Sequence, residues 1–465
     1  MNASLNGRPN IIVFFTDQQR WDTCGCYRET PVARDAEGRP LDITPNLDRM
    51  AAEGTLFRHA FTPQPVCGPA RAVLQTGVYA SETGCFTNAV ALRPDADTIA
   101  KRLRSAGYEA GYIGKWHLAS TRADRLDVCP GRVETDFRDK PIPPAYRGGY
   151  DDFWIASDTL EHTSHGYDGH MYDADGNRVE MQGYRADWVT DLAADYLRTR
   201  TGDRPFFLFV SYIEPHQQND RNCYEGPDGS KERWRHYEVP GDLAGTGGDW
   251  RSHYPDYLGC IHALDRGLGR VRETLDELGL ARDTVVLFAS DHACHFRTRN
   301  REYKRSCHEN SIRVPLVACG PGFNQGGVRD ELVSLIDIPP TLCAAAGLEV
   351  PGHMRGRPLL RPAARQPEDR PEEVFVEISE HEMGRAIRTK RWKYAVHVRG
   401  DEGWERPWSH QWTESFLYDL EADPHERDNL VADPSHAAVR AEMRARLLKH
   451  LRAVSGEATV HPAAK

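Results

Sequence analysis

Two kinds of feature in this sequence could carry chemistry. One is a Cys-x-Pro-x-Arg motif at residues 67–71. The other is a set of polar clusters, at residues 17–18, 114–117, 214–216 and 290–292, each of which directly follows a short apolar run. Their aspartates, lysine and histidines have side chains that ionise or transfer protons. Taken singly, each has an ordinary structural explanation: a buried cysteine before a helix, a helix-capping aspartate, a loop lysine or a hydrogen-bonded histidine.

The elements that must position these clusters alternate between apolar runs and helices. Strands are expected at residues 10–16, 108–113, 205–213, 284–289, 314–318 and 332–335, and helices at 44–54, 97–106, 186–200 and 254–278. Thr44 is the expected cap of the first helix. This order predicts an α/β fold with a large, mostly parallel sheet sandwiched by helices. Ligands of such sheets bind beyond the carboxyl ends of the strands, so we expect the four clusters to meet at one site.

The 465 residues allow two or three domains, and the composition changes near residue 355. We expect a catalytic α/β domain over residues 1–354, a linker rich in proline and arginine over 355–371, and a smaller C-terminal α+β subdomain over 372–465. In that subdomain, strand-like pieces at 373–378, 385–388, 392–397 and 416–420 precede a helix at 437–453.

The composition argues against several function classes. Apolar residues make up 39% and charged residues 28% of the chain, as in ordinary globular proteins. A formal net charge of −10 argues against a nucleic-acid surface, which normally carries a basic excess. The apolar run at residues 11–15 is too short for a signal peptide or a membrane span. We therefore expect neither nucleic acid nor a membrane as a partner.

The cysteines bear on the compartment. The chain has eleven, an odd number, and they form no repeated CxxC framework. Reduced thiols in a cytoplasmic protein are the simplest interpretation, with export through a precursor segment as the alternative.

Five blocks, in order along nearly the whole chain, resemble the type I sulfatases, a family of the alkaline-phosphatase-like superfamily. They are residues 10–77 with the Cys67 motif, 114–118, 290–292, 304–315 and 417–430. The resemblance implies an alkaline-phosphatase-like sheet and a sulfuric ester hydrolase. It also implies that the substrate is a small sulfate ester, with a sulfated saccharide as the first expectation.

The resemblance further implies a role for each matching residue. Cys67 would be converted to Cα-formylglycine by a separate maturation enzyme, and a hydroxyl of the hydrated aldehyde would be the nucleophile. One divalent metal would be held by Asp17, Gln18, Cys67, Asp291 and His292. Arg71, Lys115 and Lys304 would stabilise anionic oxygens, His117 would assist breakdown of the covalent intermediate, and His216 would protonate the leaving alcohol.

Two positions depart from the commonest family pattern. Gln18 stands where many members carry a second aspartate, and His292 where many carry asparagine. The change removes a negative charge and adds a nitrogen donor. The same combination occurs in choline-sulfatase-like and phosphonate-monoesterase-like relatives, some of which favour manganese, so the resemblance implies Ca²⁺ first and Mn²⁺ as the alternative. It also keeps a phosphonate monoester or phosphodiester hydrolase as the rival activity. A third hypothesis is a non-catalytic protein that binds anionic saccharides, with Cys67 left unmodified.

Other residues carry weaker signals. His162, His165 and His170 lie in a segment rich in Gly, Tyr and Asp, which indicates a surface loop more than a substrate or metal contact. Further candidates in the C-terminal subdomain could extend the pocket toward remote parts of a substrate: Glu380, His381, Arg385 and Arg388. A solvated edge strand explains these four slightly better. No motif specifies the sugar, the position of its sulfate or the oligomeric state.

Overall fold

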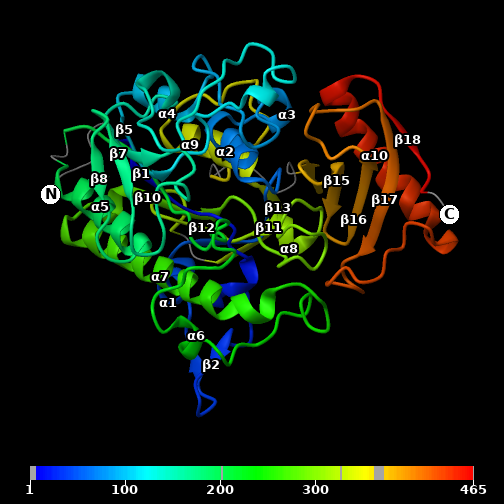
Figure 1. The fold of residues 1–465 in the computed structure, drawn as a ribbon, viewed down its shortest axis with the longest axis horizontal. Coiled ribbons are helices and arrows are strands. Elements are labelled where there is room, and N and C mark those ends of the chain that lie inside the picture. The colour runs from blue at the N-terminus through cyan, green and yellow to red at the C-terminus, as the bar shows by residue number, and fades with distance from the viewer. Residues whose placement is uncertain (1–6, 201–202, 325–326, 361–370, 464–465) are drawn as a thin grey trace.

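A computed structural model describes residues 7–200, 203–324, 327–360 and 371–463 of the chain. Within these ranges an 11-stranded sheet forms the body of the molecule, and a five-stranded sheet lies beside it. Figure 1 shows the smaller sheet, at the right of the view, with the long helix α10 (Ala437–Ser455) against it. The predicted fold class, a large α/β sheet followed by a smaller α+β part, is confirmed.

The centre of the large sheet is parallel and its flanks are antiparallel. Five parallel strands lie side by side in the order β10 (Thr284–Ser290), β1 (Asn10–Thr16), β9 (Phe206–Ser211), β5 (Glu109–Lys115) and β6 (Phe153–Ser157). Antiparallel strands continue the sheet on both sides: β12 (Leu316–Cys319), β4 (Thr55–Phe61) and β11 (Arg313–Val314) beyond β10, and β7 (His170–Asp173) and β8 (Arg178–Glu180) beyond β6. β13 (Val328–Ser334) returns parallel to β4. The flanks were not predicted, because an apolar run does not specify strand direction.

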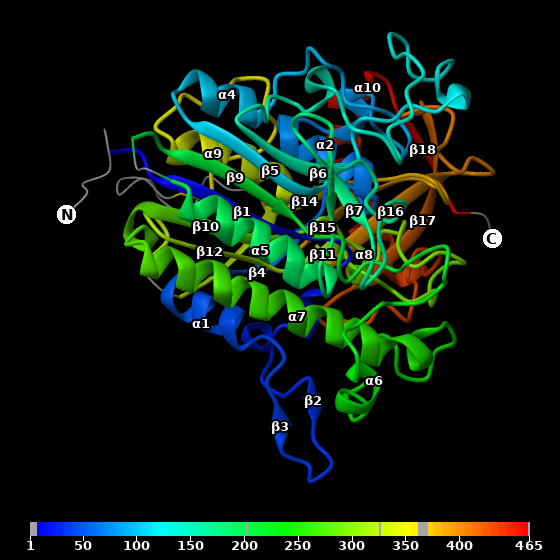
Figure 2. The ribbon, with the colours of Figure 1, turned by 60° about the vertical axis from the view of Figure 1, so that its left-hand side comes forward.

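Strand β1 shows why the sheet is buried on both faces. Ile11, Val13 and Phe15 pack into one core, whereas Ile12 and Phe14 pack into the other. Side chains alternate along a strand, so a continuous apolar run is what a strand covered on both faces requires. Figure 2 shows helices on both sides of the sheet, with α5, α7 and α1 below it and α4 and α9 above it.

The predicted helices are present, with ends that differ by a few residues. They are α1 Pro45–Glu53, α4 Ile99–Ser105, α5 Arg185–Arg198, α7 Trp250–Glu277 and α10. Helices that were not predicted are α2 Cys67–Thr76, α3 Ala80–Thr83, α6 Ser230–Arg233, α8 Glu309–Ile312 and α9 Ile338–Ala345. Thr44 is the N-cap residue of α1, as predicted, but its hydroxyl makes no capping hydrogen bond and accepts one from Gly25 N at 2.8 Å instead. Among the described helices, none is long and apolar enough to cross a membrane.

The smaller sheet packs directly on the large one. Its strands lie in the order β14 (Glu373–Ile378), β15 (Met383–Thr389), β16 (Trp392–Val398), β17 (Gln411–Asp419) and β18 (Thr459–His461). One apolar cluster contains Phe61 of β4 and Ile312 of α8 together with Val374 and Val376 of β14. Residues 361–370 of the predicted linker lie outside the described residues. Leu359, in the part of the linker that precedes them, is fully buried. Because most of the linker is not described, the proposed domain limits stay a prediction.

Candidate active site

Strand register brings the polar clusters together. β1 pairs in parallel with β10, with Thr16 opposite Ser290, so Asp17 and Asp291 leave neighbouring strands at the same level. β9 lies on the other side of β1 and pairs with β5, at whose end Lys115 stands. Carboxyl ends of neighbouring parallel strands meet at one edge of a sheet, so the predicted convergence of the four clusters follows from this pairing.

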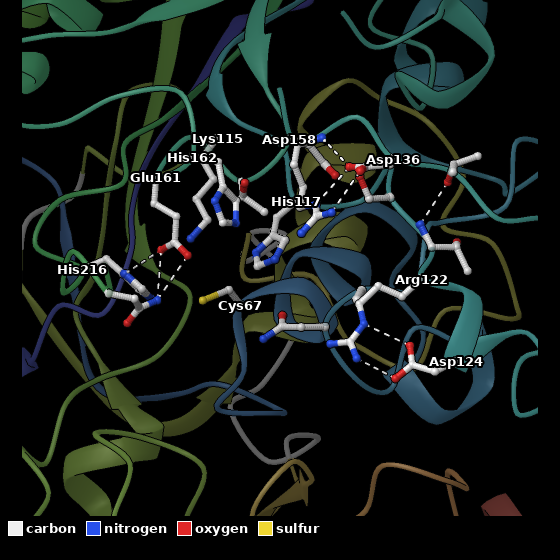
Figure 3. Close-up of a pocket in the computed structure, with 18 of the residues that line it drawn as sticks. Cys67, Lys115, His117, Arg122, Asp124, Asp136, Asp158, Glu161, His162 and His216 are labelled. Atoms are coloured by element: carbon white, nitrogen blue, oxygen red, sulfur yellow. Dashed lines mark hydrogen bonds and ion pairs between the residues drawn. The ribbon is translucent and has the colours of Figure 1, made fainter. Parts of the chain in front are cut away.

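Cys67 is the first residue of α2, which begins at the same edge. Its side chain is buried and lines a cavity of 630 Å³. The Sγ atom lies 2.7 Å from Lys304 Nζ, 3.2 Å from His292 Nε2 and 3.5 Å from Asp17 Oδ1. A structural cysteine would pack among apolar side chains, whereas Figure 3 shows this sulfur pointing into the space between Lys115, His117 and His216.

Four of the five predicted metal ligands form one buried group. Ligand atoms of Asp17, Cys67, Asp291 and His292 all lie within 4.8 Å of one another. Gln18 stands beside them with a left-handed backbone (φ 72°), and its N–H donates to Asp291 Oδ1 at 3.0 Å. The Oε1 atom of Gln18 and the Oδ2 atom of Asp291 are buried without a hydrogen-bond partner, although Oδ2 lies 3.4 Å from Arg71 Nη2. Buried oxygens without a donor are suited to accept a cation.

The electrostatics of the two carboxylates fit a divalent cation. Burial, reinforced by the neighbouring charge of Asp17, raises the pKa of Asp291 to about 7. Burial also opposes ionisation of Asp17, but Lys115, His216 and Arg71 outweigh it and hold the pKa of Asp17 well below its usual range. A cation bound between the two would favour the charged form of Asp291. Carboxylate and amide oxygens with one imidazole nitrogen suit Ca²⁺ or Mn²⁺.

The three predicted cations surround Asp17 and Cys67 in different ways. Arg71 Nη2 and Lys115 Nζ lie 2.9 Å and 2.8 Å from Asp17 Oδ2. Arg71 also donates to Ser211 Oγ and is fully enclosed, so it faces the carboxylate and not the cavity. Lys115 and Lys304, by contrast, both line the cavity.

These cations create a field that favours negative charge at residue 67. Burial alone would raise the pKa of the Cys67 thiol, but Lys115, Lys304 and His292 outweigh it and lower that pKa well below its usual range. The same field would stabilise an oxyanion attached to Cβ of this residue.

The two predicted catalytic histidines face the cavity from opposite sides of Cys67 (Figure 3). His117 follows β5 with a left-handed backbone (φ 61°), and its buried Nδ1 has no hydrogen-bond partner. His216 Nδ1 lies 2.6 Å from the Gln217 carbonyl, and its Nε2 lies 3.2 Å from Lys304 Nζ. Burial, together with Lys115 and Lys304, lowers the pKa of His216 and favours its neutral form.

Glu161 is a cavity residue that the sequence did not reveal. Its Oε2 lies 3.5 Å from His216 Nδ1, and both carboxylate oxygens accept from Asn219 Nδ2 at 3.2 Å. Glu161 comes shortly after β6, a five-residue strand that was not recognised in the sequence. The rule that polar residues after strands form the site would have found it, had β6 been identified.

The weaker candidates separate into cavity residues and packed residues. His162 lines the cavity, His165 pairs with Asp220, and His170 is buried in β7. The surface-loop prediction is therefore wrong for His170, because β7 continues the sheet. In the smaller sheet, Arg385 and Arg388 are buried and Glu380 contacts the cavity wall, so the edge-strand interpretation fails for these three.

Two family models match the chain. The model described as Sulfatase matches residues 9–348, and the model described as N-sulphoglucosamine sulphohydrolase, C-terminal, matches residues 302–453. The first covers more than half of the chain and includes every predicted catalytic and metal-ligand residue.

Individual relatives agree along almost the full length. The uncharacterised sulfatase YidJ of Escherichia coli (strain K12) is 30% identical over 479 residues, which cover 96% of this chain and 87% of that protein. An N-acetylglucosamine-6-O-sulfatase of Bacteroides thetaiotaomicron is 25% identical and covers 94% of this chain and 85% of its own. A solved Bacteroides thetaiotaomicron structure, described under the metabolism of multiple glycosaminoglycans, has a TM-score of 0.77 and 25% identity, with 96% of each chain covered.

Proposed function

Since the chain belongs to the type I sulfatases of the alkaline-phosphatase-like superfamily, and is therefore a sulfuric ester hydrolase, we propose that it hydrolyses a carbohydrate sulfate through a formylglycine made from Cys67. The observation that carries this proposal is the setting of Cys67. It lies at the cavity, 2.7 Å from Lys304 Nζ, and shares a buried group of ligand atoms with Asp17, Asp291 and His292. A nucleophile, a cation site and anion-binding lysines therefore occupy one place.

One divalent metal would be held by Asp17, Gln18, Asp291, His292 and the side chain derived from Cys67. When bound, it would supply Lewis acidity toward that side chain and the sulfate. Ca²⁺ is the first candidate and Mn²⁺ the second, because the set combines hard oxygens with one imidazole nitrogen.

The protein's own residues would divide the remaining work. Lys115 and Lys304 line the cavity and would bind sulfate oxygens, while Arg71 keeps Asp17 ionised and oriented. His117, with its unpartnered Nδ1, would accept the proton released as the enzyme returns to its resting state. His216 would protonate the leaving alcohol. Because its lowered pKa favours the neutral form, His216 would have to take up a proton before this step, while Lys304 keeps its charge 3.2 Å from Nε2.

The cavity favours a sugar as the leaving alcohol. Apart from Ala89 and Ala123, every residue that lines it carries an ionisable, amide or hydroxyl group. Such a wall offers many hydrogen bonds to a polyhydroxylated group. A relative named N-acetylglucosamine-6-O-sulfatase supports the same class of substrate.

The test is a screen of matured protein, co-expressed with a formylglycine-generating enzyme, against sulfated mono- and disaccharides. Release of free sulfate from at least one sugar, with kcat/KM above that for an aryl phosphonate monoester, supports the proposal. Dominant phosphonate or phosphodiester turnover would establish the rival activity, with which the donor pair Gln18 and His292 is also compatible. Tight saccharide binding without hydrolysis, on protein whose Cys67 stays a thiol, would establish the binding role.

A further inference from the structure

The turn between β14 and β15 carries a buried carboxylate from the smaller sheet to the wall of the cavity. Glu380 in this turn has a left-handed backbone (φ 68°), which residues other than glycine seldom adopt. Its side chain is 0% exposed. A carboxylate enclosed in this way must be held by donors, because burying an unpaired charge is costly.

All of the donors to Glu380 come from the large domain. Oε1 accepts a hydrogen bond from the backbone N–H of Asn88, and Oε2 accepts one from Asn88 Nδ2 at 3.2 Å. Oε2 also lies 2.6 Å from Nη2 of Arg305. Asn88 and Arg305 both line the cavity, although they belong to segments more than two hundred residues apart in the sequence.

Each of these two residues leads to Cys67 in one further step. Asn88 Oδ1 accepts the N–H of Gly68 at 2.9 Å, which satisfies one of the free amides in the first turn of α2, directly after Cys67. Arg305 follows Lys304, whose Nζ lies 2.7 Å from Cys67 Sγ. One carboxylate of the smaller sheet is thus connected to both sides of the residue that becomes the nucleophile.

The neighbouring residue strengthens the same connection. Ser379 Oγ accepts from Gln64 Nε2 at 2.7 Å and donates to the Phe86 carbonyl at 2.8 Å. Gln64 lies three residues before Cys67, and Phe86 lies two residues before Asn88. The turn therefore contacts two segments next to the Asn88–Gly68 hydrogen bond: the one that precedes Cys67 and the one that precedes Asn88.

We propose that Glu380 is a positioning residue, which holds the start of α2 and the Lys304–Arg305 segment in register around Cys67. The inference rests on the proposed function, because positioning matters only if residue 67 and Lys304 act on substrate. Loss of Glu380 should lower the rate strongly, since a displacement of about 1 Å of reacting groups can lower a rate by about a hundredfold.

Glu377 supplies a matched control. It lies in β14, is 1% exposed, and also binds the large domain, where Ser81 Oγ and Ser81 N donate to its carboxylate at 2.6 Å and 3.1 Å. Ser81 belongs to α3 and makes no contact with Cys67 or Lys304. Loss of the Glu377 carboxylate therefore weakens the same interface at α3, while the hydrogen bond from Glu377 N to the Pro63 carbonyl (2.8 Å) and the donors of Asn88 and Arg305 are kept.

The experiment compares Glu380→Gln with Glu377→Gln in the full, matured, metal-loaded chain. Glutamine keeps the size of the side chain but places an amide donor against the donors of Asn88 and Arg305. We expect Glu380→Gln to lower kcat by about ten- to a hundredfold, by the same factor for an aryl sulfate and a sugar sulfate. Glu377→Gln is expected to keep the wild-type kcat, even if both variants melt at a lower temperature.

Hydrogen–deuterium exchange gives a second readout that needs no turnover. Faster exchange in both the 64–70 and 303–308 segments of Glu380→Gln, and in neither segment of Glu377→Gln, supports positioning. A normal kcat in Glu380→Gln would overturn the proposal and leave a structural role. A loss confined to the sugar substrate would also overturn it, in favour of substrate recognition. If the wild type hydrolyses no sulfate ester, the proposed function fails, while the exchange data still decide whether Glu380 orders both segments.

Discussion

The active site has two halves that are built differently. The strand-end half, which comprises Asp17, Asp291 and His292, comes from the ends of β1 and β10, whose parallel register fixes these residues side by side. The loop half, which comprises Glu161, His216 and the cavity wall around them, comes from connections between elements. Lys304 also lies on a connection, one that Glu380 of the smaller sheet holds through Arg305, but its Nζ is 2.7 Å from Cys67 Sγ, so its loss should affect every ester alike.

The strand-end half would act on the sulfate group, whereas the loop half would recognise the alcohol of the ester. The strand-end residues are fully buried and contact Cys67 and one another, so every substrate would encounter them alike. The loop half lines the cavity where the alcohol of the ester would lie. Changes to the first half should therefore affect all sulfate esters equally. Changes to the second half should affect some esters more than others.

Replacement of Cys67 has the largest expected effect. Cys67→Ala removes the precursor of the nucleophile, so turnover of all sulfate esters should fall by at least about 10⁴-fold, as removal of a nucleophile does in other hydrolases. Cys343→Ala, in the buried helix α9, is the control and should keep its activity. Initial rates of sulfate release measure both. Substantial turnover by Cys67→Ala would contradict the assignment of residue 67 as the nucleophile that the strand-end residues surround.

Loss of a metal ligand is expected to have the next largest effect on activity. Saturating the wild type with Ca²⁺ at about a hundred times its Kd should raise the free energy of unfolding by about 2.7 kcal/mol. Asp291→Ala should lose this increase, together with the activity on every ester. Asp283→Ala, before the other end of β10, should keep both. Melting curves with and without Ca²⁺ or Mn²⁺ check this, and an undiminished metal response in Asp291→Ala would contradict the assigned ligands.

The loop half should discriminate by leaving group. A sugar alkoxide needs a proton to leave, whereas a nitrophenolate does not, so His216→Gln should lower kcat/KM by about a hundredfold for a sugar sulfate and less than about tenfold for nitrophenyl sulfate. His165→Gln, which pairs with Asp220 away from Cys67, should leave both values near wild type. Equal losses on the two substrates would exclude His216 as the acid.

The smallest effect is expected at the rim of the cavity. Arg122 pairs with Asp124 and is 58% exposed, so Arg122→Ala should change the free energy of unfolding by less than about 1 kcal/mol. It should raise KM for a sugar sulfate a few-fold and leave nitrophenyl sulfate unchanged, because it lines the cavity beyond the sulfate position. Arg93→Ala removes a similar exposed pair, with Asp95, outside the cavity lining. Identical kinetics of the two variants would show that the rim does not contact substrate.

The two halves also differ in how far the sequence predicts them. Asp17 and Asp291 follow apolar runs long enough to identify as strands, and the sheet then determines that they meet. Glu161 was missed because β6 is short and partly exposed. For Glu380 the sequence favours a solvated edge strand, because its partners Asn88 and Arg305 are distant in sequence and no local pattern encodes a contact between two sheets. The resemblance implied that Arg71 stabilises anionic oxygens of the reaction, whereas in the structure its guanidinium faces Asp17 and not the cavity.

The central claim is that hydrolysis depends on conversion of Cys67. The most direct measurement compares the converted fraction with activity across preparations made with increasing amounts of the maturation enzyme. Mass spectrometry of the Cys67 peptide gives the fraction, because conversion of the thiol to the aldehyde lowers its mass by about 18 Da. We predict that kcat for a sugar sulfate rises in proportion to that fraction and extrapolates to zero at no conversion. Full activity on an unconverted thiol, or no activity at full conversion, would contradict the claim.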